Sequence, residues 1–215
     1  AHRLFGIRRL GVLVDEFRYD TASLSGNALD NRAQRFLAEA LETIAITLFP
    51  NRVVSLTYLS RVMTPQGEEL RLAGWYPKDL AVDKDFVVSL SDSGEQSYAK
   101  LAWDSGKTLY LPYVKQDWAF RVTSPLQAGG PIRYRRAADG LWKKSSRIHD
   151  FKSLLVIPSL ILSNLANREW EIHGVLNVEG HKRDAFSDVD IFCACVAANK
   201  IAQGVKIHAA RKHTP

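Results

Sequence analysis

The sequence has 215 residues, of which 46% are hydrophobic and 24% are charged. This balance is typical of one globular domain and excludes a largely disordered chain. No apolar run approaches the roughly 18 residues of a membrane-spanning helix, and residues 4–14 do not resemble a signal peptide. The formal net charge of +6 permits an anionic partner without requiring one. Because the first residue is Ala1 and not Met, we allow that the sequence is a piece of a longer protein.

Residues 1–28 are predicted to be an N-terminal extension and linker. Their apolar residues follow helical spacing: Leu4, Phe5, Ile7, Leu10, Val14 and Phe17. Gly6 and Gly11 weaken that pattern, and residues 21–28 have the composition of a linker. The simpler interpretation is a segment that packs on the core or on a neighbouring molecule, and a functional segment is the alternative.

A helix, a hairpin and a second helix are expected next. Asp30 is a good helix cap, and apolar residues then keep helical spacing until Pro50. Residues 53–60 and 70–76 read as two strands of a hairpin with Gly67 in its turn. After a short element and loop at 79–91, a helix is predicted at 97–105 and a third strand at 107–112, with Gly106 between them.

Residues 113–150 are too long for an ordinary connection and hold an excess of basic residues. Eight lysines and arginines stand against three aspartates, so the segment carries a net +5 (8 − 3). It also contains Trp118, Phe120, Tyr134 and Trp142. A hairpin over Asp139-Gly140 is predicted for residues 132–142.

The last part of the chain predicts two strands and a helix. Residues 153–160 are almost continuously apolar, as in a strand that is covered on both faces. Residues 172–178 alternate in the manner of a second strand. Ser187 should cap the final helix, with Asp188 and Asp190 in its first turn, where the helix dipole favours negative charge.

This last part resembles the end of a GAF domain, the sensor module of bacterial signalling proteins and of cyclic-nucleotide phosphodiesterases. The family pattern is a Ser-hydrophobic-x-hydrophobic-Pro strand, then Gly-hydrophobic-Leu-x-hydrophobic, then Phe-Ser/Thr-x-x-Asp. The matching residues are Ser153, Val156, Pro158, Gly174, Val175, Leu176, Val178, Phe186, Ser187 and Asp190. Residues 102–111 also resemble the family's helix–Gly–strand step. The pattern indicates a fold more than a function, because one fold hosts many ligands.

The resemblance implies an α/β (α+β) fold. A central five- or six-stranded, mainly antiparallel sheet would carry the N- and C-terminal helices on one face, and a lid loop with a short helix on the other. The GAF-like domain would cover residues 29–208, with a C-terminal tail at 209–215. In the family the two terminal helices often form a dimer, so a homodimer is expected.

Catalysis is not expected. Residues 105–108 read Ser-Gly-Lys-Thr, but the upstream glycine of a phosphate-binding loop is missing. None of the six histidines pairs with another at the helical spacing of a zinc site, so no metal site is predicted. Some GAF proteins reduce free methionine sulfoxide with loop or strand cysteines, whereas Cys193 and Cys195 fall on the predicted last helix. Their spacing also argues against a disulfide between them. Cysteines without a disulfide suit the reducing environment of the cytoplasm.

The sequence leaves the cofactor unknown. Bilin-binding members attach the chromophore through a cysteine of the long loop, and residues 113–150 contain none. Members that bind cyclic nucleotides carry an Asn-Lys…Phe…Asp-Glu signature. At the matching positions this chain keeps Phe186 and Asp188 but has Gly180, His181 and Val189 in place of Asn, Lys and Glu.

A pocket between the sheet and the lid remains the candidate site. Its predicted lining consists of aromatic residues, two lid arginines and one strand histidine: Trp75, Tyr76, Tyr98, Trp103, Tyr110, Tyr113, Trp118, Arg133, Arg135 and His173. Aromatic walls with a few polar groups are typical of ligand sites, and an arginine can hold a carboxylate or phosphate. The alternatives are that the aromatics are core, that the arginines are solvated and that the histidine is structural.

The sequence therefore predicts a sensor domain. It would bind a small anionic or aromatic ligand and transmit a conformational change through the terminal helices to an output domain or a partner protein. The alternative is a protein–protein or nucleic-acid interaction module that uses the basic segment at 113–150.

Overall fold

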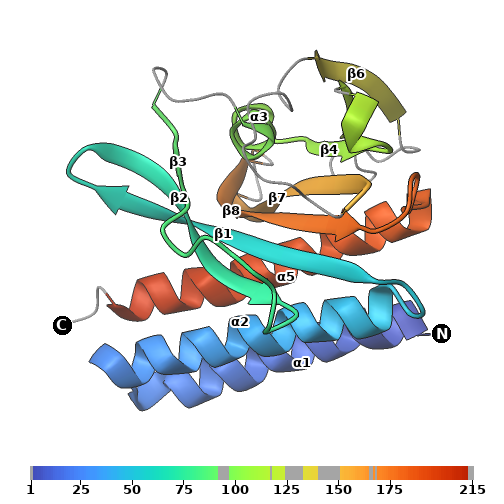
Figure 1. Cartoon of the computed structure of the whole chain (residues 1–215). Helices are drawn as coiled ribbons and strands as arrows, with labels where there is room; N and C mark the ends of the chain where they lie inside the picture. Colours follow the sequence, from blue (N-terminus) through green and yellow to red (C-terminus); the bar gives the residue numbers. More distant parts are fainter. Residues whose placement is uncertain are drawn as a thin grey trace.

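The structure is a computed structural model that describes residues 2–91, 97–116, 118–123, 133–139, 151–164, 167 and 169–212. It has three layers (Figure 1). Helices α2 (Gly26–Leu48) and α5 (Asp188–Lys212) cover one face of a sheet, and α1 (His2–Asp20) packs against both of these helices. The short helix α3 (Tyr98–Ser105) lies on the other face. Among the described helices, none is long and apolar enough to cross a membrane.

The described strands form one antiparallel sheet in the order β3-β2-β1-β8-β7-β4-β5-β6. The central strands are β1 (Val54–Thr64), β8 (Glu169–Gly180) and β7 (Ser153–Asn164). On one side lie β2 (Gly67–Tyr76) and β3 (Val87–Ser89); on the other lie β4 (Thr108–Leu111), β5 (Trp118–Thr123) and β6 (Arg133–Asp139). The α+β class and the placement of the terminal helices agree with the prediction.

The predicted count of five or six strands is wrong, because the described part of the sheet has eight. The difference comes from β3, which extends the sheet beyond β2, and from residues 113–150, where β5 and β6 extend it beyond β4. Charged residues dominate β6, which is the edge strand of the described sheet and exposes the side chains of residues 133–136, so the segment has the composition of a loop. The partner of residues 133–139 is β5, and the turn predicted at Asp139-Gly140 extends outside the described residues.

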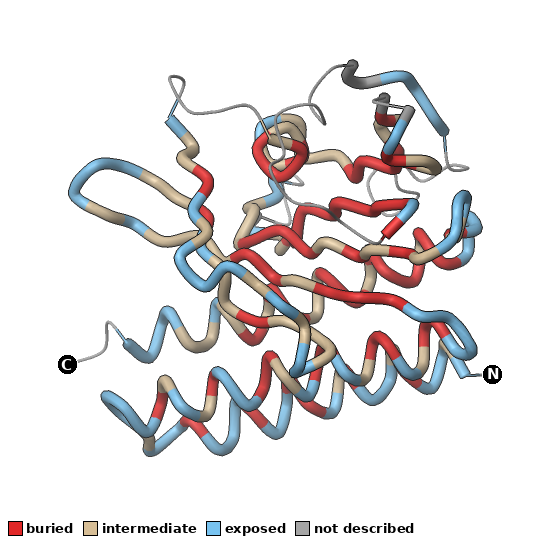
Figure 2. Tube along the Cα trace, viewed as in Figure 1, coloured by how far each residue is buried: buried red, intermediate tan, exposed pale blue. Residues whose placement is uncertain are grey.

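Two apolar cores lie on the two sides of the sheet (Figure 2). The larger one joins α1, α2 and α5 to the sheet, and the smaller one lies under α3. Helix α1 contributes Leu10, Leu13, Val14 and Phe17 to the larger core. The linker composition of 21–28 is misleading, since Thr21–Ser23 is a 3-10 helix and α2 starts at Gly26. Helix α2 thus starts before the predicted cap at Asp30, and Leu29 in its first turn is buried.

Local capping signals predict the element ends well. Ser97 accepts a hydrogen bond from the backbone nitrogen of Lys100 at 3.1 Å, and Gly106 ends α3 with φ of 59°. At the start of α5, the Asp190 backbone nitrogen donates to Ser187 Oγ at 3.3 Å, and the Ser187 backbone nitrogen donates to Asp190 Oδ2 at 2.8 Å. This reciprocal pair is a capping box with Asp in the acidic position.

Asp190 also holds together segments that are far apart in the sequence. Its carboxylate is fully buried and accepts from Arg3 at 2.5 Å and from Arg52 at 2.7 Å. Arg3 lies in the first turn of α1, and Arg52 lies between α2 and β1. The start of α5, the start of α1 and the entry to β1 are therefore tied to one buried charge.

Candidate functional site

Polar side chains interrupt the apolar surface on the sheet face that carries α3. In β1 and β8, residues Leu56, Tyr58 and Leu176 belong to the core under the long helices. Side chains alternate across a strand, so Thr57 and Asn177 face the α3 side. They are register partners, and Asn177 Nδ2 donates to Thr57 Oγ1 at 3.0 Å.

The Thr57–Asn177 pair is the middle of a row that crosses six strands. Trp75 of β2 is the register partner of Thr57. On the other side the row continues through Val156 and Leu109 to Arg121 of β5. The row therefore presents an indole, a hydroxyl and amide, an apolar stretch and a guanidinium in succession.

Arg121 is the charged end of this row. It is half-buried, and its Nε atom is buried without a hydrogen-bond partner within the described part of the chain. With adjacent strands about 4.8 Å apart, Arg121 and Asn177 stand about 14 Å from each other, a span that an extended arginine and a small ligand cover together. The sequence analysis counted Arg121 only as part of the basic segment. The alternation of Ala119, Arg121 and Thr123 on one face of a strand is the signal that could have identified it.

A second polar row runs beside the first. Ser55 and Glu179 are register partners two residues along β1 and β8, and they face the same side. Ser55 is buried and Glu179 is half-buried. The centre of this face thus carries four polar residues on two adjacent strands, where the surrounding residues of the smaller core are apolar.

Five of the residues predicted from sequence lie on this face. Trp75 belongs to the row, and Tyr98 and Trp103 come from α3, which packs on the face. Arg61 lies 5.9 Å from the centre of the Trp103 ring. Arg133 and Arg135 are exposed on β6, with Arg135 the register partner of Arg121. Half of the ten residues predicted from sequence therefore lie on this face of the sheet.

Two predicted residues lie on the opposite face. Tyr110 belongs to the core under the long helices, and Tyr76 packs against that core. The Tyr110 hydroxyl donates to Asp184 Oδ1 at 2.5 Å. Burial and the neighbouring Asp184 raise the pKa of Tyr110 far above its usual value, so it stays a neutral donor. The aromatic content of a strand does not show which face of the sheet each aromatic residue joins. The alternation of side chains along the strand does show it.

The remaining predicted residues lie at the margins. Tyr113 stacks under Arg183, whose guanidinium is 3.7 Å from the ring centre. Trp118 opens β5, and its side chain lies outside the described residues. His173 Nε2 lies 3.2 Å from Glu171, and burial lowers the pKa of His173 although Glu171 opposes that shift. This contact places His173 beside Glu171 and not in the row.

Strand β6 connects this face to α5. Arg135 faces the α3 side, whereas Tyr134 faces the other side, where its hydroxyl donates to Asp188 in the first turn of α5. Burial and this acceptor raise the pKa of Tyr134 well above its usual value. Tyr134 therefore links β6 to the first turn of α5.

Metal and thiol chemistry have little support on this face. In the ranges that the structure describes, no three His, Cys, Asp or Glu side chains are grouped so that they could hold a metal ion. Both cysteines of the chain are buried in α5, on the opposite side of the sheet. Burial raises the pKa of the Cys193 thiol, which disfavours the reactive thiolate.

No protein-family model matches the chain, and no curated protein matches it in sequence. Solved structures do match. The phycocyanobilin-bound GAF domain of a cyanobacterial phytochrome has a TM-score of 0.61 at 15% identity, covering 99% of this chain and 98% of that one. A GAF domain from an Acinetobacter phosphoenolpyruvate-protein phosphotransferase has a TM-score of 0.56 at 14% identity, covering 96% and 94%. A type II free methionine-R-sulfoxide reductase from Thermoplasma acidophilum reaches 0.52 at 15% identity, covering 82% and 94%. The chain has the GAF fold.

Proposed function

We propose that this GAF-fold chain is a sensor domain that binds a small organic ligand on the α3 face of its sheet. The observation that carries the proposal is the Thr57–Asn177 pair, which lies beside Ser55 and Glu179 among the apolar core residues of this face. Their mutual bond satisfies part of the hydrogen-bonding capacity of these two side chains, and the rest is available to a ligand on this face.

The residues of the row suit a ligand with a ring and an acidic group. Trp75 offers a flat apolar surface for a ring. Asn177 and Thr57 retain further hydrogen-bonding capacity after their mutual bond. Arg121, with Arg135 beside it on β6, can pair with a carboxylate or a phosphate. The cyanobacterial phytochrome domain holds a bilin, which combines rings with carboxylates; this supports the ligand class without identifying the ligand.

Transmission of the ligand-induced conformational change would start from β6. A ligand that draws Arg121 and Arg135 towards the row would shift β5 and β6, and Tyr134 would pass the shift to Asp188 at the start of α5. Such a ligand changes the population of two arrangements of α5 against α1 and α2, and an output domain or a partner protein would detect that change.

The double variant T57V/N177L tests the proposed site. Replacing both members of a hydrogen-bonded pair by apolar side chains is nearly neutral or stabilising, by up to about 1 kcal/mol. Thermal unfolding of the variant should therefore begin no earlier than that of the wild type. Against a panel of nucleotides, amino acids, aromatic acids and tetrapyrroles, the wild type should show a thermal shift that the variant lacks. A shift of equal size in both proteins would place the site elsewhere.

We propose that binding, and not catalysis, is the activity. The fold includes methionine-R-sulfoxide reductases, and their chemistry requires a reactive thiol. Cys193 and Cys195 lie inside α5, and Cys195 Sγ is 3.3 Å from Thr108 Oγ1. We expect no formation of methionine from free methionine-R-sulfoxide and dithiothreitol beyond that of a C193S/C195S control. Turnover that disappears in the control would show that the protein is an enzyme. We also propose a cytoplasmic location, because Cys193 and Cys195 are not joined in a disulfide.

We propose a homodimer through the solvent face of α1. Phe5, Val12 and Tyr19 lie seven residues apart on that face and are 65%, 40% and 84% exposed. Arg8 and Arg9 precede Val12, and Asp15 and Glu16 follow it at the same separations. Two antiparallel copies related by a two-fold axis at Val12 would bring Phe5 to Tyr19 of the second copy and basic residues to acidic ones.

Cysteine crosslinking tests this dimer. A Phe5→Cys variant should form a disulfide with a Tyr19→Cys variant under mild oxidation and should not crosslink with itself. Self-crosslinking of the Phe5→Cys variant would indicate parallel helices, and a monomeric wild type in light scattering would contradict the dimer.

A second candidate function is nucleic-acid binding along β6. Arg133, Arg135 and Arg136 are exposed on this edge strand together with Tyr134. Binding of a single-stranded oligonucleotide that falls steeply between two salt concentrations would favour this function over the ligand site.

A further inference from the structure

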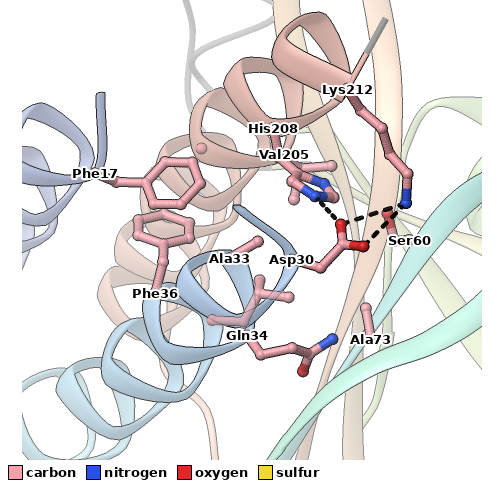
Figure 3. A pocket seen from close by; sticks show the side chains of 12 residues that line it. Phe17, Asp30, Ala33, Gln34, Phe36, Ser60, Ala73, Val205, His208 and Lys212 are labelled. Carbon is pink, nitrogen blue, oxygen red and sulfur yellow. Dashed lines mark hydrogen bonds and ion pairs between the residues drawn. The ribbon is translucent and has the colours of Figure 1, made fainter. Parts of the chain in front are cut away.

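A cavity lies on the opposite side of the sheet from the Thr57–Asn177 row. Its volume is about 350 Å³, within the range of roughly 300–1,000 Å³ that is typical of small-molecule sites. It is bounded by α2, by the last turns of α5, and by Ser60 of β1 and Ala73 of β2 (Figure 3). The proposed sensor function makes no use of it.

One side of the cavity is apolar and firmly supported. Ala33, Leu37 and Val205 line it, and the rings of Phe17 and Phe36 close it with their centres 4.8 Å apart. Gly204 permits this packing, because a Cβ atom there would lie 2.2 Å from a carbon of the Phe36 ring. Close packing behind the wall means that these side chains do not collapse into the space.

The other side carries an ion-pair group. Asp30 Oδ1 lies 2.7 Å from His208 Nε2, and Lys212 Nζ lies 3.3 Å from each Asp30 oxygen. The hydrogen bond with His208 is the main cause that lowers the pKa of Asp30, so the carboxylate is ionised at neutral pH. The Gln34 amide and the Ser60 hydroxyl also line the cavity, and neither has a hydrogen bond to another residue in the described ranges.

The two bonds to Asp30 differ in how readily they are replaced. The His208 bond is short, and the His208 side chain is mostly buried. The Lys212 contacts are long, and the Lys212 side chain is 58% exposed at the end of α5. Exposed ion pairs of this kind contribute about 0–1 kcal/mol. An incoming cation therefore needs to displace only Lys212, whereas an incoming anion would have to break the His208–Asp30 bond.

We infer that this cavity binds a small organic amine. Its apolar body lies against Ala33, Leu37 and Val205, and its ammonium group replaces Lys212 at Asp30 while His208 keeps the other oxygen. The Gln34 amide and the Ser60 hydroxyl supply further acceptors for the ammonium protons. The site is independent of the proposed sensor site, since the two lie on opposite faces of the sheet.

Phenethylamine is a suitable probe, because it joins one ring to one primary amine. In a methyl NMR titration it should shift the signals of Ala33, Leu37, Ala73 and Val205 and leave those of Leu109 and Val156 unchanged. The neutral 2-phenylethanol and the anionic 3-phenylpropionate should bind at least about tenfold more weakly, the loss expected for one charge-assisted hydrogen bond.

Asp30→Asn keeps the shape of the side chain and an acceptor for His208 but removes the charge. Phenethylamine should bind this variant at least about tenfold more weakly. Asp20→Asn is the matched control, because Asp20 is similarly exposed and also ion-paired, at 2.9 Å to Arg32, and should leave the affinity unchanged. Binding should also persist in T57V/N177L, so failure of the sensor site and failure of this site are separable. Four results would each overturn the inference. Two concern the ligands: equal binding of phenethylamine and 2-phenylethanol, or tighter binding of 3-phenylpropionate. The other two are an unchanged affinity of Asp30→Asn for phenethylamine and the absence of NMR shifts at the four lining residues.

Discussion

Asp190→Ala is expected to lower the free energy of unfolding by about 3 kcal/mol, near the lower end of the cost of removing one partner from a buried ion pair. The fully buried carboxylate accepts from Arg3, Arg52 and the Ser187 backbone nitrogen, and its removal leaves the two arginines only their bonds to the carbonyl oxygens of Leu48 and Ala185. The estimate stays near the lower end because the two arginines are about one-third exposed and regain water. Urea denaturation measures the loss.

Asp15→Ala is the matched control for this variant. The Asp15 side chain is 75% exposed and lies 3.6 Å from Arg18, so its removal should change stability by less than about 0.5 kcal/mol. If the two variants were equally stable, the buried carboxylate would not hold the three segments together.

Asp190→Ala should also change how the free energy of unfolding depends on pH. Burial by itself would raise the Asp190 pKa, but hydrogen bonds from Ser187 and Arg52 outweigh burial and lower the pKa below its usual value. A lowered pKa in the folded state means that the stabilisation is complete above the unfolded value of about 3.9 and is lost as the pH falls through the folded value. The difference in stability between wild type and Asp190→Ala should therefore shrink below about pH 4.

Phe17→Ala is expected to cost about 3–5 kcal/mol, the usual loss for a fully buried phenylalanine. Phe17 is 0% exposed, although it belongs to a helix whose sequence reads as an extension. Its ring packs on Phe36 of α2, and the pair closes one end of the cavity beside α5. The variant should unfold at a markedly lower urea concentration than wild type.

Arg18→Ala, one position further along α1, serves as the comparison. Its side chain is exposed, so its loss should be within about 0.5 kcal/mol. If Phe17→Ala were as stable as Arg18→Ala, α1 would be an appended helix that the remaining domain does not need.

Much of the fold can be predicted from the sequence because its signals are local. Ser97, Gly106 and Ser187 mark helix ends through bonds to their own neighbours, and the hairpin at Gly67 needs only a turn between two apolar strands. Helix α1 could not be placed in this way. Gly6 weakens its helical pattern, yet Gly6 is required by contact with α2, where a Cβ atom would lie 1.9 Å from Thr47 Oγ1.

The site was only partly predictable. The sequence shows which residues a strand contains, but the face of the sheet that each residue joins depends on how the strands pair. The sequence nominated Trp75 and Tyr76 together, although neighbouring residues of a strand point to opposite sides. It also passed over Thr57 and Asn177, which become informative only when β1 and β8 are paired in register. Arg121 was hidden in a segment of uniformly basic composition, and its position on an inner strand distinguishes it from the exposed arginines of β6.

The most direct test of the proposed ligand site is a mass spectrum of the small molecules released on denaturation. The wild type and T57V/N177L would be purified in parallel without added ligand. We expect one small molecule, carrying an aromatic ring or an acidic group, to be released from the wild type and to be absent or strongly reduced in the variant. The same molecule in the same amount from both proteins would contradict a ligand site at Thr57 and Asn177.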